Sequence, residues 1–327
     1  MRVLVTGAAG FVGRPAVARL LAEGHEVRAT VRTLSESADP RVDWRVTGDL
    51  TGAVDWAAVL QGVDAVVHLA ALAHQVGRKG LGRMEEFLRV NEGVTADLAR
   101  AARQSSVRRF VLLSSVASVG GRGLEPVNEE TPEHPEGDYG RSKLAAERAI
   151  AGILAGSPVS WIALRAPLVY GAENPGNMAR LLALLERGWP LPFAGLRNSR
   201  SFLYVENLVD AIVTALCGGA AAEGVFFVDD GTRFSTPGLC AALATARGLP
   251  LRLFRLPPTA LRALGRLGDL GEWMLRRDLP INTYSVERLS GSLVVDGRRF
   301  VAATGWRPPV STFEAIHRTV TPSASER

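Results

Sequence analysis

The sequence is poor in cysteine and has no long apolar run. Its two cysteines, Cys217 and Cys240, fit no metal or redox motif, so we interpret both as small buried hydrophobic residues in a reducing compartment. No apolar run reaches the roughly 18 residues that a transmembrane helix needs, which predicts a chain without a membrane span. Because the sequence opens directly on the strand-like run RVLVT, we expect no signal peptide and a cytoplasmic location.

Neither sign of charge is in large excess. The 327 residues include 38 Lys and Arg against 33 Asp and Glu, and the net charge of +5 is spread along the chain. Such a small excess gives little support to nucleic acid or an anionic membrane as partner, and a mildly basic enzyme for phosphorylated small molecules explains it as well. With 47% hydrophobic residues, the chain can bury a sizeable core.

The first two thirds of the chain alternate strand and helix patterns. RVLVT, EVRATV, DWRVT, DAVVHLAA and RRFVLLSS read as compact strands, WIALRAPLVYG reads as a longer one, and amphipathic helical stretches separate them. This order predicts an α/β fold with a Rossmann-type, doubly wound parallel sheet, whose ligands bind beyond the carboxyl ends of the strands. We expect residues 1–171 to form the dinucleotide-binding domain, to which later segments return. Residues 172–320 should form a smaller mixed α/β part that mainly binds substrate, short strand GVFFVDD included, and residues 321–327 a disordered tail.

A glycine-rich turn follows the first strand. VTGAAGFVG places Gly7, Gly10 and Gly13 between a strand and an amphipathic helix. Glycine lets the backbone turn tightly, approach a pyrophosphate and pack the helix on the strand, and the helix N-terminus then faces the anion. The turn therefore predicts dinucleotide binding.

The acidic residue that ends the second strand of many dinucleotide-binding domains is missing. In VRATVR its place is taken by Val31, which Arg32 follows. A carboxylate there would bind the ribose hydroxyls and repel a 2′-phosphate, so its absence beside an arginine favours NADP(H), with NAD(H) still possible. Thr33 and Ser35 offer further hydrogen-bond donors, whereas Arg28 lies in mid-strand and we interpret it as structural.

Tyr139 and Lys143 lie four residues apart at the start of a predicted helix, so both side chains share one face. Tyrosine has an ordinary pKa near 10, and a nearby ammonium would lower it. Tyr139 could then donate a proton to a carbonyl that is reduced, or accept one from an alcohol that is oxidised. Ser115, at the end of a strand, would bind the same oxygen, and the sequence leaves Ser114 and Ser118 as alternatives.

These motifs together resemble the extended short-chain dehydrogenase/reductases. The turn T-G-x-x-G-x-x-G, GDL, HLAA, LSS and Y-x-x-x-K come in that family's order, and LRAPLVYG, RSFLYVENLVDAI, GSLVVD and TGWRP resemble its NAD-dependent epimerase/dehydratase (UDP-glucose 4-epimerase-like) branch. The resemblance reaches to about His317. It implies a Rossmann fold, a nucleotide-sugar site and a homodimer. It also implies cofactor contacts from Tyr139, Lys143 and these further residues: Gly7, Gly10, Phe11, Val12, Gly13, Arg32, Asp49, Leu50, Leu69, Ala70, Ala71 and Pro167.

The same resemblance implies where substrate binds. Arg200 and Arg288 match positions that hold a diphosphate, for which a planar guanidinium is well suited, and Asn177 matches an asparagine that contacts the nucleotide-sugar. Ser115 completes the expected substrate contacts, and we expect no metal. Asn91 matches a structural or water-binding asparagine. His68 ends a strand, and we interpret it as a packed residue rather than a catalytic one.

The reaction follows from the cofactor. An epimerase oxidises and re-reduces one carbon with a held NAD, whereas a reductase draws hydride from NADPH, so the strand tip favours a reductase for 4-keto nucleotide-sugars. A nucleotide-sugar 4-epimerase, a small-carbonyl (dihydroflavonol-reductase-like) reductase and a non-catalytic dinucleotide sensor or assembly subunit remain alternatives. A dehydratase is disfavoured, because Val116 and Ala117 stand where such enzymes carry an Asp-Glu pair.

Overall fold

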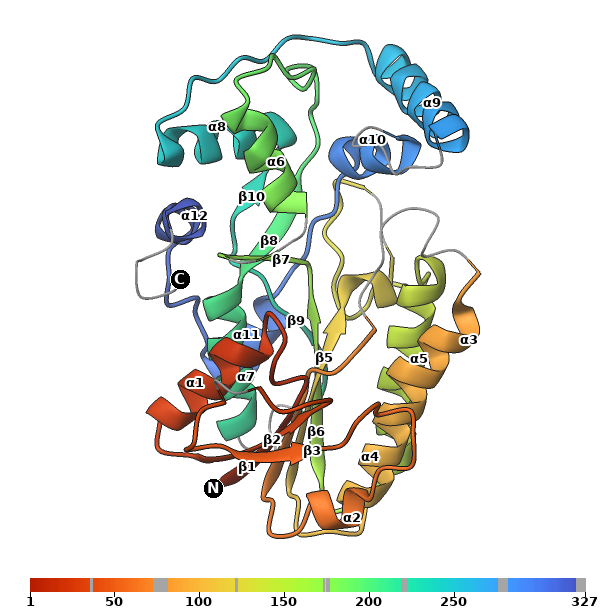
Figure 1. Cartoon of the computed structure of the whole chain (residues 1–327), viewed down its shortest axis with the longest axis vertical. Helices are drawn as coiled ribbons and strands as arrows, with labels where there is room; N and C mark the ends of the chain where they lie inside the picture. The colour runs from red at the N-terminus through yellow and green to blue at the C-terminus, as the bar shows by residue number, and fades with distance from the viewer. Residues whose placement is uncertain are drawn as a thin grey trace.

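The computed structural model describes residues 1–35, 38–72, 82–120, 123–172, 174, 177–218, 223–275 and 282–321. Two parts lie one above the other in Figure 1, a larger part around a parallel sheet and a smaller part above it. The tail that was expected to be disordered lies outside the described residues from 322 onward.

The larger part is a seven-stranded sheet in which every neighbouring pair is parallel. Its order is β3-β2-β1-β4-β5-β6-β9, which confirms the predicted Rossmann-type sheet. The strands are β1 (Arg2–Thr6), β2 (Glu26–Val31), β3 (Asp43–Val46), β4 (Ala65–His68), β5 (Arg109–Ser115), β6 (Ser160–Ala166) and β9 (Gly224–Phe227).

Helices cover both faces of this sheet (Figure 1). Buried aliphatic side chains alternate between the two faces along each strand, so both faces need a cover. One face packs against α1 (Gly13–Ala22), α7 (Val205–Cys217) and α11 (Arg298–Thr304). The other packs against α2 (Trp56–Val59), α4 (Val94–Arg103) and α5 (Gly137–Leu154), beside α3 (Met84–Phe87) and the π-helical turn Leu88–Gly93.

The smaller part is built on a mixed sheet of order β10-β8-β7, with β7 parallel and β10 antiparallel to β8. An aromatic core that includes Tyr170, Phe202 and Tyr204 joins this sheet to its helices. The strands are β7 (Leu168–Tyr170), β8 (Arg200–Tyr204) and β10 (Arg233–Phe234), and the helices are α6 (Asn177–Glu186), α8 (Thr236–Arg247), α9 (Pro258–Leu275), α10 (Thr283–Ser290) and α12 (Thr312–Val320).

Three sequence interpretations need correction. WIALRAPLVYG is not one strand, because the chain leaves the large sheet after Ala166 and joins the small sheet at Leu168, and the intervening Pro167 has no N–H to donate. GVFFVDD belongs to the large sheet as its last strand, β9, rather than to the substrate-binding part. Cys240 is buried as expected, but Cys217 ends α7 and is exposed.

Candidate active site

The glycine turn packs so tightly that side chains cannot be added. Gly7 has a φ of +70°, and a Cβ on it would lie 2.7 Å from the backbone nitrogen of Ala70. A Cβ on Gly13, where α1 begins, would lie 2.1 Å from the carbonyl oxygen of Gly7. The turn therefore brings strand end, helix start and the β4 loop together, which is the cradle that a pyrophosphate needs.

A buried hydrogen-bond chain fixes the end of β4 beside this turn. His68 lies between two hydroxyls, with Nδ1 2.6 Å from Thr6 Oγ1 and Nε2 2.9 Å from Thr95 Oγ1. The Thr95 hydroxyl donates its proton to the Asn91 carbonyl, so toward His68 this hydroxyl can only accept a hydrogen bond. The His68 ring is therefore neutral and carries its proton on Nε2. Thr6 Oγ1 in turn accepts the backbone N–H of Ala70 at 3.2 Å. Burial, aided by the charge of Lys143, lowers the pKa of His68 to about 3, which agrees with a packed rather than a catalytic histidine.

The other predicted cofactor residues line the carboxyl edge of the large sheet. Asp49 is exposed, and its carboxylate accepts two hydrogen bonds from Thr51, one from the Thr51 backbone N–H at 3.0 Å and one from the Thr51 hydroxyl at 2.9 Å. These bonds lower the pKa of the Asp49 carboxyl. The charge of Arg32 acts in the same direction, so Arg32 is near Asp49. Pro167 is buried and Ala71 is exposed, and the half-buried remainder comprises Phe11, Val12, Leu50, Leu69 and Ala70.

A pocket at the tip of β2 contains an arginine that the sequence analysis missed. Arg14, directly after Gly13, lines this pocket together with Val31, Thr33 and Ser35. Its Nε donates to the Ala9 carbonyl at 3.1 Å, which holds the side chain against the glycine turn. Its place immediately after the last glycine of the turn was the available signal. Arg28, by contrast, is buried and bound to Asp43, as its structural interpretation predicted.

Ser115 and Tyr139 meet at the carboxyl end of β5. Ser115 is the last residue of that strand, and its hydroxyl accepts the Ala117 N–H at 3.2 Å to cap the short 3-10 turn Val116–Ser118. Tyr139, in the first turn of α5, forms a side-chain hydrogen bond with Ser115. Burial raises the pKa of Tyr139, while the bond to Ser115 and the charge of Arg288 act in the opposite direction. The hydroxyl of Tyr139 is therefore a proton donor near neutral pH.

Lys143 binds the strand β5. Its Nζ donates to the Leu113 carbonyl at 2.7 Å. That its charge lowers the pKa of Tyr139 stays a prediction. Burial lowers the pKa of Lys143 to about 8, against the opposing effect of Glu147. The ammonium thus lies beside the end of β5, one helical turn from Tyr139, where it can reach a ligand on that edge.

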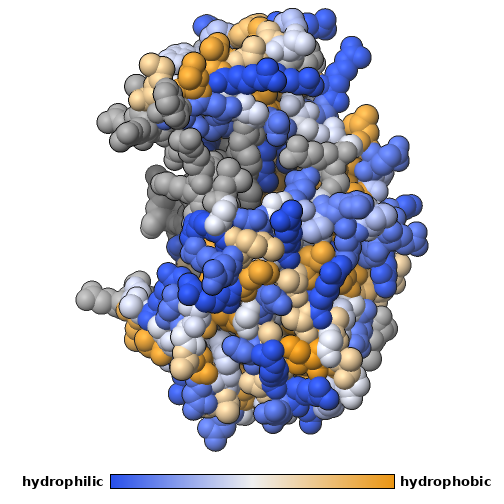
Figure 2. Space-filling view, turned by 90° about the vertical axis from the view of Figure 1, so that its right-hand side faces the viewer, coloured by the Kyte–Doolittle hydropathy of each residue, from blue (hydrophilic) through white to orange (hydrophobic). Residues whose placement is uncertain are grey.

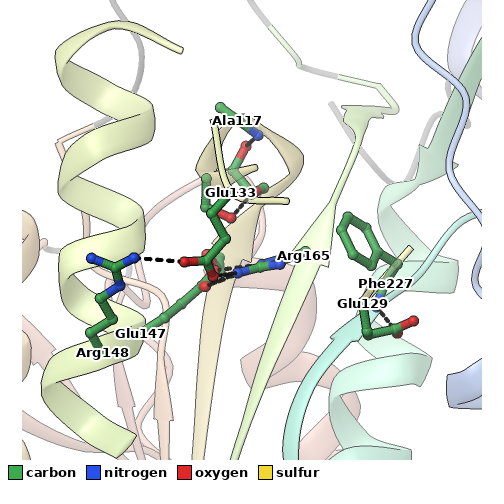
Figure 3. Close-up of polar contacts among 10 residues, drawn as sticks. Ala117, Glu129, Glu133, Glu147, Arg148, Arg165 and Phe227 are labelled. Atoms are coloured by element: carbon green, nitrogen blue, oxygen red, sulfur yellow. Dashed lines mark hydrogen bonds and ion pairs between the residues drawn. The ribbon is translucent and has the colours of Figure 1, made fainter. Parts of the chain in front are cut away.

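A buried ion pair, Glu147 with Arg165, is the centre of a network of polar contacts that begins one helical turn after Lys143 on α5, and Figure 3 shows this network. Glu147, one turn further along α5, binds Arg165 of β6 through Nη2 at 2.6 Å and through Nε at 3.1 Å, and both side chains are almost completely buried. Ser114 also donates to Glu147. Arg165 also forms an ion pair with Glu133, and the exposed Arg148 binds the same Glu133 carboxylate at 2.7 Å. The Arg165 guanidinium lies 5.5 Å from the centre of the Phe227 ring. The network ties α5, β5, β6 and β9 together behind the catalytic candidates.

Asn91 supports the same corner from the π-helical turn. Its amide receives the Leu72 N–H at 2.7 Å and donates to the Ser142 hydroxyl at 2.9 Å. Ser142 donates to the Tyr139 carbonyl at 2.8 Å. Asn91 therefore connects the loop after β4 to the first turn of α5, which is a structural role.

A second pocket lies in the smaller part, and it contains both arginines predicted to hold a diphosphate. Arg200 and Arg288 line it, and Arg200 donates to the Arg288 backbone carbonyl, so β8 and α10 meet there. Apolar side chains such as Met178 and Leu239 form most of the remaining wall. Asn177 begins α6 next to Met178, and its side chain lies outside the described part of the structure. The charge of Arg288 reaches Tyr139, which links this pocket to the catalytic candidates.

Two further kinds of site were searched for. Among the described residues, no group of three or more His, Cys, Asp or Glu side chains is arranged to hold a metal ion. None of the described helices is both long enough and apolar enough to cross a membrane.

Comparisons with known proteins agree with this geometry. A family model described as the NAD dependent epimerase/dehydratase family matches residues 3–225. A UDP-glucose 4-epimerase of Vibrio cholerae is 33% identical over 97% of this chain and 94% of its own length. A ketoreductase of Stigmatella aurantiaca is 28% identical over 82% of this chain and 80% of its own. The structure of MoeE5 in complex with UDP-glucose and NAD has a TM-score of 0.76 and 26% identity, covering 98% of this chain and 97% of that one. The chain is thus a member of the NAD-dependent epimerase/dehydratase family, an enzyme of the extended short-chain dehydrogenase/reductase type.

Proposed function

We propose that this enzyme reduces the C4 ketone of a nucleotide-activated sugar, with NADPH as hydride donor. The observation that carries the proposal is the position of the hydrogen-bonded pair Ser115 and Tyr139. The pair lies at the strand edge beside the glycine turn, and the charge of Arg288 acts on it from the pocket that Arg180, Arg200 and Arg288 line. A dinucleotide cradle on one side and a basic pocket on the other suit a substrate that carries a sugar on a diphosphate.

The residues of this chain would divide the work as follows. The bound dinucleotide would supply the hydride. Tyr139 would donate its phenolic proton to the carbonyl oxygen as that oxygen gains negative charge, and Ser115 would donate a hydrogen bond to the same atom. Lys143 would hold the cofactor ribose from its place beside the end of β5. Arg200 and Arg288 would bind the diphosphate, with Asn177 beside them, and position the sugar.

The preference for NADP(H) rests on the tip of β2. Arg32 is exposed there, Val31 offers no carboxylate, and Arg14 lines the adjoining pocket with Thr33 and Ser35. Two guanidinium groups and two hydroxyls can bind a 2′-phosphate, which the missing acid would otherwise repel. We also propose that residues 172–320 mainly bind the substrate and that the enzyme is a homodimer.

The test is single-turnover reduction of a UDP- or dTDP-linked 4-keto-sugar, followed by NADPH absorbance and by mass spectrometry of the sugar. We expect stoichiometric NADPH consumption and a product two mass units heavier. If NADPH is consumed with small ketones but with none of the nucleotide-sugars tested, the enzyme is a small-carbonyl reductase instead. Cofactor binding without turnover of any ketone would assign a sensor or assembly subunit.

A 4-epimerase is the second candidate, because the Vibrio cholerae relative with that name matches this chain almost from end to end. Such an enzyme would interconvert UDP-glucose and UDP-galactose without net consumption of NADPH. The same preparation therefore decides between the two reactions: isomerisation with no added reductant supports the epimerase and contradicts the reductase.

A further inference from the structure

Helix α9 has one face that is fixed against the rest of the protein. Leu261 on that face is buried, and Gly265 lies so close to α10 that a Cβ on it would be 3.0 Å from the Cα of Thr283. Figure 1 shows α9 at the outer edge of the smaller part, beside α10. Among the residues that the structure describes, the close packing of α9 is therefore on the side that faces α10.

The opposite side of α9 is apolar and exposed. Leu267, Leu270 and Met274 have exposed fractions of 64%, 53% and 70%. With 100° between successive helical residues, these three side chains fall within a sector of about 60°, roughly opposite Leu261 and Gly265. In Figure 2 the upper end of the molecule, where the smaller part lies, shows hydrophobic residues next to strongly hydrophilic ones. The stripe is thus a second apolar face of a helix whose first apolar face is already buried.

Charge is segregated around this stripe. The two acidic residues of α9 face α10: Asp269 accepts the Thr283 N–H at 3.0 Å, and Glu272 accepts from the Asn282 side chain at 2.8 Å. Arg262 and Arg266 are exposed beside the stripe, and neither is ion-paired with any other residue that the structure describes. The segment leading into α9 adds exposed Arg252 and Arg255, together with exposed Leu251 and Phe254.

We propose that α9 docks this enzyme on an anionic membrane surface. The helix would lie in the plane of the interface, with Leu267, Leu270 and Met274 among the acyl chains and with Arg262 and Arg266 on lipid phosphates. Its 18 residues span about 27 Å, which suffices for a surface helix, while its charges prevent it from crossing the bilayer. The arginines beside the stripe match anionic headgroups, and that complementarity selects a lipid surface over a second copy of this basic protein.

The inference is independent of the reaction proposed above, because it uses none of the catalytic residues. Docking would nevertheless place the substrate site close to the membrane. Helix α10, which packs on α9, contributes Ser285, Arg288 and Leu289 to the arginine-lined pocket of the smaller part.

The experiment is flotation of the full-length protein with vesicles of phosphatidylcholine alone and of phosphatidylcholine mixed with phosphatidylglycerol. We expect flotation with the anionic vesicles, reduced by added salt, and weak flotation with the neutral ones. Leu267→Ser/Leu270→Ser/Met274→Ser should weaken binding at least about tenfold. Each of Arg262→Gln and Arg266→Gln should weaken it about fivefold.

Phe313→Ser is the matched control, because Phe313 on α12 is 73% exposed and lies away from α9. It should float like the unmodified protein, and all variants should keep the same melting curve because the replaced side chains are exposed. Absence of flotation with anionic vesicles, or equal flotation of the triple variant, overturns the proposal. One further result would overturn it. If no variant floats, and sedimentation equilibrium shows a dimer that only the triple variant loses, then a second copy of the protein covers the stripe.

Discussion

Replacing Arg165 by methionine should be among the most destabilising single substitutions in this protein. Arg165 is 4% exposed and Glu147 is 3% exposed, and three hydrogen bonds of 2.6 to 3.1 Å join them. Methionine fills much of the same space but leaves the Glu147 carboxylate buried, with the Ser114 hydroxyl as its remaining close donor. Breaking one side of a buried pair costs about 3–5 kcal/mol, because an uncompensated charge remains in a low-dielectric environment.

Two companion variants make the origin of the loss visible. In Glu147→Met/Arg165→Met neither member of the pair remains without the other, and Glu133 keeps Arg148 at 2.7 Å, so most of the lost stability should return. Arg148→Met is the matched control: its side chain is 69% exposed, and the pair it forms should contribute at most about 1 kcal/mol.

Urea unfolding followed by circular dichroism gives the free energy of unfolding of the unmodified protein, of these three variants and of the single variant Glu147→Met. The reasoning fails if Arg165→Met costs no more than Arg148→Met. It also fails if the double variant costs as much as the sum of its two single substitutions, because the pair would then have no coupling energy.

Four further expectations concern the site. Tyr139→Phe should keep cofactor affinity and lower turnover by about 10²- to 10⁴-fold, and near-normal turnover would remove Tyr139 from the chemistry. Val31→Asp/Arg32→Asn should shift preference from NADP(H) toward NAD(H) by roughly 10- to 150-fold, and tighter calorimetric binding of NAD(H) by the unmodified protein would contradict this. Arg200→Ala should weaken UDP, dTDP or GDP binding by about 1.5–3 kcal/mol and leave NADPH binding unchanged, whereas equal affinity would return Arg200 to a structural role. For His68, whose pKa is lowered to about 3, the unfolded state binds the extra proton, so stability is lost as the pH falls. Relative to His68→Gln, the free energy of unfolding should drop by about 1.5–2 kcal/mol from pH 6.5 to pH 5, and parallel pH curves would refute it.

The parts of the fold that the sequence predicts are those encoded locally. Strand runs and the spacing of Gly7, Gly10 and Gly13 depend on neighbours in the chain, and the glycines sit where a Cβ would strike backbone. Pro167 also carried a local signal, the missing N–H, although the run around it reads as one strand. Cys217 reads as apolar in sequence, but it ends its helix in solvent.

The parts that the sequence does not predict depend on which distant groups meet. Nothing near Lys143 indicates that its ammonium binds the Leu113 carbonyl, which lies 30 residues earlier. Likewise, Glu147 and Arg165 are both charged residues in apolar surroundings, and only the packing of α5 on β6 shows that each neutralises the other. Arg14 follows the last glycine of the turn, which is a local signal, but only the structure shows that it shares a pocket with the tip of β2.

The charges around Tyr139 bear on the direction of the proposed reaction. A reductase needs a tyrosine that holds its proton until the carbonyl oxygen becomes negative, and burial raises the pKa of Tyr139 in that sense. Among the influences that oppose burial is the positive charge of Arg288, which lines the pocket proposed for the diphosphate. A bound diphosphate would neutralise that charge, so substrate binding would raise the pKa of Tyr139 further. In the proposed reduction, the substrate therefore helps to keep the proton donor protonated, and the rate should fall only at alkaline pH, where Tyr139 loses its proton.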